Sequence, residues 1–317
     1  MSEKTHSPVG VSLIQIGAEN AGQRIDNFLL TQLKGVPKSH IYRILRTGEV
    51  RVNGGRIQAG KRLSAGDVVR LPPVRTSAPV ETPVGSVSAL RRRLESRILM
   101  EDSDLLVIDK PGGIAVHGGS GLSLGIIEGL RRIREEARFL ELVHRLDRDT
   151  SGCLVIAKKR SALRALHEQF RGKEVQKVYT ALLEGVWHQA SRRVEQALEK
   201  NVLQSGERLV KPSEHGKNAV TVFRRLQGYR ALTLVEAEPL TGRTHQIRVH
   251  AKCLGHPIAG DQRYGSSDRT RELRQMGLRR LFLHAARLTF THPGTREPLS
   301  VEAPLDPELQ HFLAHLR

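Results

Sequence analysis

The stretch ELVHRLDRDTSGCLVIAKKR, residues 141–160, places a short charged loop between two apolar runs. The runs LELV and CLVIA are short and apolar, which is typical of buried β-strands. The loop should therefore emerge at the end of a sheet, where rigid elements hold its side chains in place. Asp147 lies in this loop between Arg145 and Arg148, and neighbouring cations favour the ionised form of a carboxyl group. Two interpretations are open: a structural ion pair, or a carboxylate kept ionised for chemistry.

The chain from about residue 96 onward consists of strand patterns with few helices between them. The strands are predicted from the runs DLLVIDKPGG, GCLVIAKK, VYTALLEGV, ALTLVEAEPL and LFLHAARLTFTHP. Helices are expected only at about 123–136, 161–171 and 244–254 and at the C-terminus. Because strands outnumber helices and do not alternate regularly with them, the sequence predicts an α+β fold with mixed, largely antiparallel sheets rather than a doubly wound fold.

Residues 21–72 have the pattern of a separate helix-helix-hairpin-strand module. The stretches AGQRIDNFLLTQL and VPKSHIYRILRTG carry apolar residues at helical spacing. Ser39 is the expected N-cap of the second helix, and Gly48 its C-terminal stop. EVRVNGGRI predicts a hairpin with a turn at Asn53 and Gly54, and LSAGDVVRLPP predicts a closing strand.

The segments on either side of this module have weaker patterns. Residues 1–20 are expected to be a tail with one edge strand, VSLIQI. Residues 73–95 contain Pro, Ser, Thr and Gly without a sustained period, which predicts a linker. The expected domain order is therefore a tail, a small module, a linker and a larger domain over residues 96–317.

The chain is strongly basic, with 51 Lys and Arg against 33 Asp and Glu, a net charge of +18 and a pI near 10.6. Such a charge indicates a polyanionic partner, most often nucleic acid. The segment from Arg24 to Arg70 contains ten Lys or Arg and three Asp or Glu, so its net charge is +7. Arg43, Arg46 and Arg51 lie close together there and are candidates for phosphate contacts, although a solvated helix face is the alternative.

Several classes of protein and site are not expected. The two cysteines, Cys153 and Cys253, form neither a CxxC zinc motif nor a disulfide framework, and they favour a reducing compartment. No apolar run approaches the ~18 residues that span a membrane, and the N-terminus lacks the apolar core of a secretory signal. The sequence therefore predicts a cytoplasmic protein without membrane attachment.

Two further stretches contain candidate site residues. Tyr179 lies near the start of the strand-like run QKVYTALLEGV, where an ordinary core tyrosine is the alternative. In PLTGRTHQIRVHAKCLGHPIAGD, Thr244 is the expected cap of a helix whose first turn also contains Arg243, His245, Gln246 and Arg248. Cations at a helix N-terminus oppose the macrodipole, so an anion is expected nearby, either a carboxylate or a phosphate.

Motifs for metals and nucleotides are weak in this sequence. His245 and His250 are five positions apart, which differs from the spacing of a helical zinc site. The glycine-rich stretch KPGGIAVHGGSGLSLG lacks the Gly-Lys-Ser/Thr ending of a P-loop. We therefore expect neither a metal nor a nucleotide cofactor.

Three motifs in this order, HRLDRDTSG, QKVYTALLEG and TGRTHQIRVH, resemble those of the RluA-type pseudouridine synthase family. The N-terminal module, with RIDNFL, SHIYRILRTGEVRVNG and LSAGDVV, resembles the S4 RNA-binding domain. The resemblance covers the chain from about residue 20 to residue 317. It implies an S4 domain over residues 21–72 and a catalytic domain over residues 96–317.

The resemblance also implies a reaction and a substrate. It implies isomerisation of uridine to pseudouridine at chosen positions of 23S rRNA, free or in a large-subunit assembly intermediate, without a cofactor. A monomer is expected on other grounds, because RNA rather than a partner chain would cover the basic surface. Two alternatives are a tRNA-directed synthase of the same reaction class and a non-catalytic rRNA-binding or ribosome-assembly protein.

The matched motifs imply roles for individual residues. Asp147 is the carboxylate beside the ribose, which either attacks C1′ or takes a sugar proton. Arg248 pairs with Asp147, Ile247 packs against the uracil, and Tyr179 stacks on the base and helps to remove the C5 proton. Arg145 fills the stack that the flipped base leaves. Further RNA contacts are expected from His144, Arg243, His245 and Gln246 in the catalytic domain and from Arg24, Ser39, Arg43, Arg46 and Arg51 in the S4 module.

Overall fold

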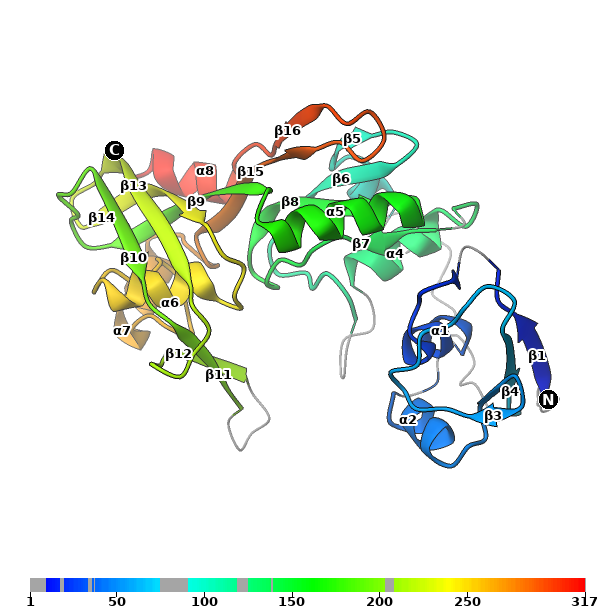
Figure 1. Cartoon of the computed structure of the whole chain (residues 1–317). Coiled ribbons are helices and arrows are strands. Elements are labelled where there is room, and N and C mark those ends of the chain that lie inside the picture. Colours follow the sequence, from blue (N-terminus) through cyan, green and yellow to red (C-terminus); the bar gives the residue numbers. More distant parts are fainter. Residues whose placement is uncertain are drawn as a thin grey trace, which may run out of the picture. The chain divides into compact units, whose positions relative to one another are not determined.

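The computed structural model describes residues 10–17, 20–33, 36, 38–74, 91–118, 125–137, 139–202 and 208–316. The chain divides into two compact units, residues 1–83 and 84–317 (Figure 1). One apolar cluster, between Ile16 and Val74, fills the first unit, and four other clusters fill the second. Each unit therefore has its own core.

The first unit packs two helices against a small sheet in the order β1-β4-β2-β3. Phe28, Ile41 and Ile44 of the helices are buried against the strands. Asn53 and Gly54 have φ angles of 50° and 79°, as the predicted two-residue hairpin turn requires. The elements are β1 (Ser12–Gln15), α1 (Ile25–Gln32), α2 (Lys38–Arg46), β2 (Arg51–Val52), β3 (Gly55–Arg56) and β4 (Val68–Leu71).

Two boundaries in this unit differ from expectation. The helix α2 begins at Lys38, so Ser39 lies within its first turn and is not the N-cap. The strand β1 pairs with β4, which confirms the edge strand but makes it part of the folded unit rather than of a tail.

The second unit is built on a ten-stranded sheet in the order β10-β13-β14-β9-β15-β8-β6-β5, with β16 paired to β15 and β7 to β8. All pairs are antiparallel except β15 with β8, which confirms the predicted mixed, largely antiparallel α+β fold. The strands are β5 (Ile98–Glu101), β6 (Leu105–Lys110), β7 (Glu141–Leu142), β8 (Ser151–Ala157), β9 (Gln176–Glu184), β10 (Ser191–Glu195), β13 (Val220–Gly228), β14 (Leu232–Pro239), β15 (Leu283–Thr291) and β16 (Pro298–Glu302). A separate ribbon pairs β11 (Leu198–Val202) with β12 (Arg208–Pro212).

Helices cover both faces of this sheet. Apolar residues of α4 (Ile126–Ile133) join one core cluster with β6 and β8, and those of α5 (Arg160–Gly172) join another cluster with the opposite faces of the same strands. The helices α6 (Gln246–Cys253) and α8 (Pro307–Ala314) pack on the part of the sheet that contains β9 and β14. None of the helices in the described ranges is long and apolar enough to cross a membrane.

Two helical segments were not predicted. The helix α7 (Ser267–Gln275) buries only Leu273, so its sequence lacks an apolar stripe. Residues 91–95 are helical and bury Leu94 in the core, although they were expected to belong to the linker. The linker segment 75–90 lies outside the described residues.

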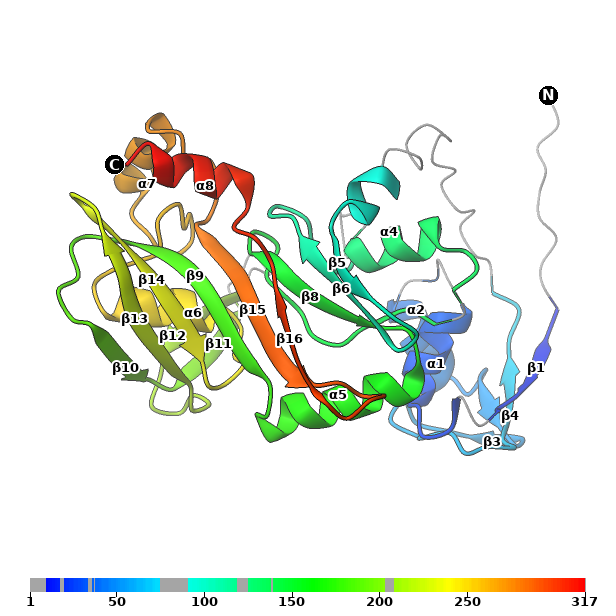
Figure 2. The same ribbon diagram turned by 90° about the horizontal axis from the view of Figure 1, so that it is seen from above.

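The centre of the sheet positions the site. The strand β15 lies between β8 and β9, and Figure 2 shows it in orange between these two green strands. Gly152 at the start of β8 has a φ of 105°, and a Cβ there would lie 2.2 Å from the carbonyl oxygen of Ala285. This close approach brings the loop before β8, which contains Asp147, beside β15 and hence near Tyr179 on β9.

Candidate active site

Asp147 lies in the loop between β7 and β8, and its side chain is 22% exposed. Its Oδ2 is 3.7 Å from Nη1 of Arg248 and 3.8 Å from Nε2 of His245. The expected partners, Arg145 and Arg148, do not pair with it in the part of the chain that the structure describes. Arg148 Nε instead donates to the carbonyl of Gly113, and Arg145 is exposed. The groups that face Asp147 therefore come from α6 and its N-cap, about 100 residues further along the sequence, and Arg248 is the cation among them.

Arg248 is held in place by a second carboxylate, that of Asp261. Its Nε and Nη2 donate to the two oxygens of Asp261 at 2.7 Å each, which leaves Nη1 directed at Asp147. Burial opposes ionisation of Asp261, but the hydrogen bonds from Arg248 keep the pKa of Asp261 below its ordinary value. The anion expected near this helix end is thus present as two carboxylates. Asp261 itself was missed, because its only sequence signal is an acid in the turn after the helix.

His245 is the N-cap of α6, with a φ of 52°, so Thr244 does not occupy the predicted capping position. The hydroxyl of Tyr264 accepts from the amide of Val210 at 3.1 Å and lies 2.8 Å from Nδ1 of His245. The hydroxyl is free to donate its own proton to Nδ1, and with this assignment the proton of a neutral His245 lies on Nε2, which faces Asp147. Burial lowers the pKa of His245, which favours this neutral form.

Tyr264 also supports Arg248. The centre of its ring lies 5.0 Å from the guanidinium carbon, within the range of a cation–π contact. The same side chain thus orients both groups that face Asp147, although the sequence offered no signal for this role.

Tyr179 lies on β9, where its backbone pairs with Ala285 of β15 and Ala237 of β14. Burial, followed by the charge of Asp147, raises the pKa of Tyr179 above its ordinary value. The side chain is therefore a neutral phenol near the carboxylate. Ile247 on α6 is only 6% exposed and packs in the core.

Two of the residues predicted to contact RNA, His144 and Gln246, make hydrogen bonds inside the fold. Nε2 of His144 accepts from the amide of Val155, and its ring stacks on Phe170 at 5.1 Å. Burial lowers the pKa of His144 to about 4, so this ring is neutral. Gln246 is 3% exposed, and its amide binds Thr241, Thr221 and the backbone of Arg243 and Val220.

The other predicted RNA-contacting residues are on the surface of their units. Arg243 is exposed, although its Nε donates to the carbonyl of Asn218. In the first unit, Arg24 pairs with Asp26 at 2.7 Å, with its side chain 46% exposed. Ser39, Arg43, Arg46 and Arg51 are exposed on α2 and β2.

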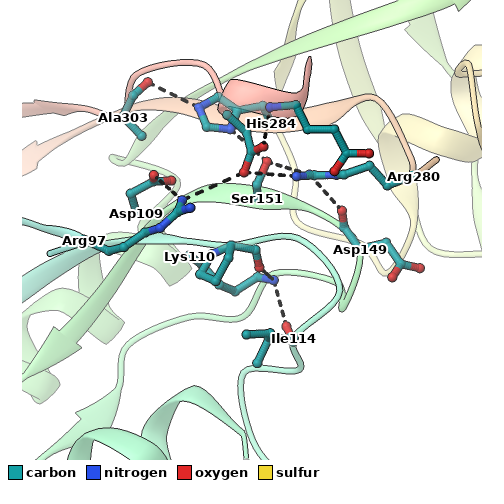
Figure 3. Close-up of polar contacts among 12 residues, drawn as sticks. Arg97, Asp109, Lys110, Ile114, Asp149, Ser151, Arg280, His284 and Ala303 are labelled. Atoms are coloured by element: carbon teal, nitrogen blue, oxygen red, sulfur yellow. Dashed lines mark hydrogen bonds and ion pairs between the residues drawn. The ribbon is translucent and has the colours of Figure 1, made fainter. Parts of the chain in front are cut away.

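A buried polar network lies behind the loop that carries Asp147 (Figure 3). Lys110, at the end of β6, is fully buried, and its Nζ donates to the carbonyls of Pro111, Ile114 and Arg148 at 2.8–2.9 Å. Arg280 donates to the carbonyl of Asp149 at 3.2 Å and to Oγ of Ser151 at 2.7 Å. The backbone after Asp147 is therefore held by two cations that no motif identified.

One group of side chains among the described residues has the composition of a metal site, namely Asp102, Asp104 and His292. Both ring nitrogens of His292 are already used, Nε2 by Asp102 and Nδ1 by the amides of Gly294 and Thr295. No imidazole nitrogen is left there for an ion.

Comparison with known proteins defines the class. The model of the RNA pseudouridylate synthase family matches residues 104–252, and that of the S4 domain matches residues 23–69. A relative from Yersinia pestis is 59% identical over 314 residues, which is 99% of this chain and 98% of its own. The chain therefore belongs to the RNA pseudouridylate synthase family and contains an N-terminal S4 domain. The predicted enzyme class, an isomerase, is confirmed.

The relative from Yersinia pestis is a ribosomal large subunit pseudouridine synthase C. The protein of the same name from Escherichia coli strain K12 is 58% identical over 316 residues, which is 99% of each chain. Among solved structures, human RNA pseudouridylate synthase domain containing 4 has a TM-score of 0.61 at 29% identity, over 74% of this chain and 97% of that one.

Proposed function

We propose that this protein isomerises uridines of 23S ribosomal RNA to pseudouridine. The names of the relatives, which are similar over nearly the full length of both chains, support the substrate. The observation that carries the chemistry is Asp147, half-buried, with Arg248 and His245 facing one of its oxygens and Tyr179 within electrostatic reach. In the reaction the N1–C1′ bond breaks, the uracil turns over, and C5 bonds to C1′.

Asp147 is the proposed group that acts on the ribose. Its carboxylate either attacks C1′ to form a covalent intermediate or takes a sugar proton on the way to a glycal. Arg248 restricts the rotamer of this carboxylate through a charge-assisted contact. His245 offers an N–H beside the same oxygen.

Tyr179 is the proposed partner of the base. Its ring stacks on the uracil that has left the RNA stack. Its raised pKa keeps the hydroxyl protonated, so Tyr179 accepts the C5 proton only as its own proton passes to water. Ile247 packs on α6 directly before Arg248 and is proposed to contact the uracil with the small part of its surface that stays exposed.

The proposed RNA contacts are divided between the two domains. In the S4 domain, Arg43, Arg46 and Arg51 are exposed and are proposed to contact phosphates. In the synthase domain, Arg145 is exposed in the loop of Asp147 and is proposed to fill the vacated stack. We further propose that the protein acts as a monomer without a cofactor, on 23S rRNA or a large-subunit assembly intermediate. The predicted domain limits, 21–72 and 96–317, are extended to include β1 in the S4 domain and residues 91–95 in the synthase domain.

Release of tritium from unmodified 23S rRNA labelled at C5 of uridine tests this function. The wild type should release tritium, and Asp147→Asn should not, while its RNA affinity stays within a few fold. Asp268→Asn is the control, because this carboxylate is exposed on α7 and pairs with the exposed Arg271. Release from tRNA but not from 23S rRNA would contradict the substrate, and release by Asp147→Asn at the wild-type rate would contradict the catalytic role.

A further inference from the structure

The side chain of Lys110 makes a set of hydrogen bonds that only a charged lysine can complete. Its Nζ lies 2.9 Å from the carbonyl oxygen of Pro111, 2.8 Å from that of Ile114 and 2.9 Å from that of Arg148. Carbonyl oxygens are acceptors only, so each of these bonds needs an N–H. An ammonium group has three N–H groups, whereas a neutral amine has two and a lone pair. The observed geometry is therefore that of the ammonium form.

This cation is buried without a direct carboxylate partner among the described residues. The charged groups that act on it are Asp109 on its own strand, Asp147 and Asp149 in the loop, and Arg280. Burial, together with repulsion from Arg280, lowers the pKa of Lys110 to about 7, although the three carboxylates oppose this shift. The ammonium form is thus held mainly by backbone carbonyls, one of which follows Asp147 directly.

Arg280 fixes the next part of the same loop. It donates to the carbonyl of Asp149 and to Oγ of Ser151, and its Nη1 pairs with Asp306 at 3.1 Å. The hydroxyl of Ser151 can then donate to Nδ1 of His284 at 2.9 Å, while Nε2 of His284 donates to the carbonyl of Ala303 at 3.2 Å. Figure 3 shows this chain of contacts running from Asp149 to Ala303.

A glycine in the turn after Lys110 leaves space for the side chain of Arg280. A Cβ at Gly112 would lie 2.3 Å from the guanidinium carbon of Arg280, so a side chain there would displace the arginine. The glycine, the lysine and the arginine together form one support beneath residues 148–151.

We propose that Lys110 and Arg280 are positioning residues that hold the backbone after Asp147 and so direct its carboxylate at the ribose, and that Lys110 does so only in its ammonium form. This inference rests on the proposed function. When Lys110 loses its proton, one of the three carbonyls faces a lone pair and the loop loses a support. The isomerisation step should therefore slow at alkaline pH.

The test is the single-turnover rate of tritium release from C5-labelled 23S rRNA between pH 6 and pH 9.5, with RNA affinity measured separately. The wild-type rate should fall at least tenfold over the alkaline half of this range. Lys110→Met should be at least tenfold slower at pH 6.5 and should lack the alkaline decrease, with RNA affinity nearly unchanged. If ionisation of the uracil caused the slower rate at alkaline pH, the decrease would persist in Lys110→Met. That result would overturn the role of Lys110.

Lys177→Met is the matched control. Lys177 is also a largely buried lysine with a lowered pKa, but its Nζ donates to Val175 at the start of β9 and not to the loop of Asp147. This variant should keep the wild-type rate and alkaline decrease. If it loses the decrease instead, the titrating lysine is not Lys110.

Two variants of Arg280 test the second support without altering Lys110. Arg280→Met should lower the turnover rate at least tenfold without weakening RNA binding, and Arg280→Lys should recover part of the loss. If Lys110→Met fails to fold, the wild-type pH profile and the two Arg280 variants still test the proposal. A wild-type rate that is constant from pH 6.5 to pH 9.5 contradicts it, and so does an Arg280→Met variant that is as fast as the wild type. Failure of the proposed function would differ, because the wild type would then release no tritium at any pH.

Discussion

Asp147 shows at the scale of single residues what the sequence could and could not predict. The motifs identified Asp147, Tyr179 and Arg248, and the structure brings these three together. The groups that orient them, Asp261 and Tyr264, were missed because their contacts depend on the fold and not on spacing along the chain. Conversely, the amide of Gln246 was predicted to contact RNA, but in the structure it makes its hydrogen bonds within the protein.

The contact between Asp261 and Arg248 carries a prediction at this scale. Asp261→Asn removes one charge of a buried, two-bond ion pair and leaves Arg248 without its main partner. We expect the free energy of unfolding to fall by about 3–5 kcal/mol. Denaturant unfolding measures this change. The rate of tritium release should fall as well, because Nη1 of Arg248 is no longer directed at Asp147.

An exposed ion pair is the control for this prediction. Asp268 and Arg271 face each other on α7 with most of their side chains exposed. Asp268→Asn should change stability by less than about 0.5 kcal/mol. Equal effects of the two substitutions would mean that the Asp261 pair does not support the site.

At the scale of elements, local patterns predicted most strands but not their order. The runs that became β6, β8, β9, β14 and β15 were recognised from short apolar stretches, and the hairpin at Asn53 and Gly54 from its turn residues. Pairing between β15 and β8 joins residues more than 130 positions apart, and no local period encodes such a contact. The polar helix α7 escaped prediction because it buries a single apolar residue.

Gly152, where β8 meets β15, carries the prediction for this scale. Gly152→Ala should lower the free energy of unfolding by more than about 2 kcal/mol, because the φ of 105° disfavours a side chain and the new Cβ would overlap Ala285. Denaturant unfolding tests this expectation. Gly54→Ala is an instructive comparison: its φ is also positive, but no atom lies within 4 Å of its Cβ position, so the loss should be smaller. An equal loss at both positions would exclude a role for the close approach.

At the scale of the whole molecule, the chain combines a small basic S4 domain with a larger synthase domain, and each has a core of its own. The order of the two domains could be predicted from motifs, whereas the contribution of β1 to the first one needed the structure. Because the cores are separate, each domain should fold without the other.

The prediction for the whole molecule concerns salt. A chain that lacks residues 1–83 should bind 23S rRNA more weakly than the full protein. Its affinity should also depend less steeply on salt. The slope of the logarithm of the binding constant against the logarithm of the salt concentration should become shallower by about 0.7–0.9 for each phosphate that the shortened protein no longer neutralises. Affinity measured at several salt concentrations tests this. An unchanged slope would mean that the S4 domain does not bind phosphates.

The position of β15 has a consequence for how the enzyme comes into being. Asp147 precedes β8 and Tyr179 lies on β9, and these two strands join one sheet only when β15, residues 283–291, pairs with both of them. On a translating ribosome, this strand is made more than 100 residues after Tyr179 and more than 130 residues after Asp147. Until then β8 and β9 both present unpaired edges, which are the part of the nascent chain most prone to aggregation. The catalytic centre can thus be assembled only after β15 has been made, and a ribosome that stalls before this point carries a chain without it.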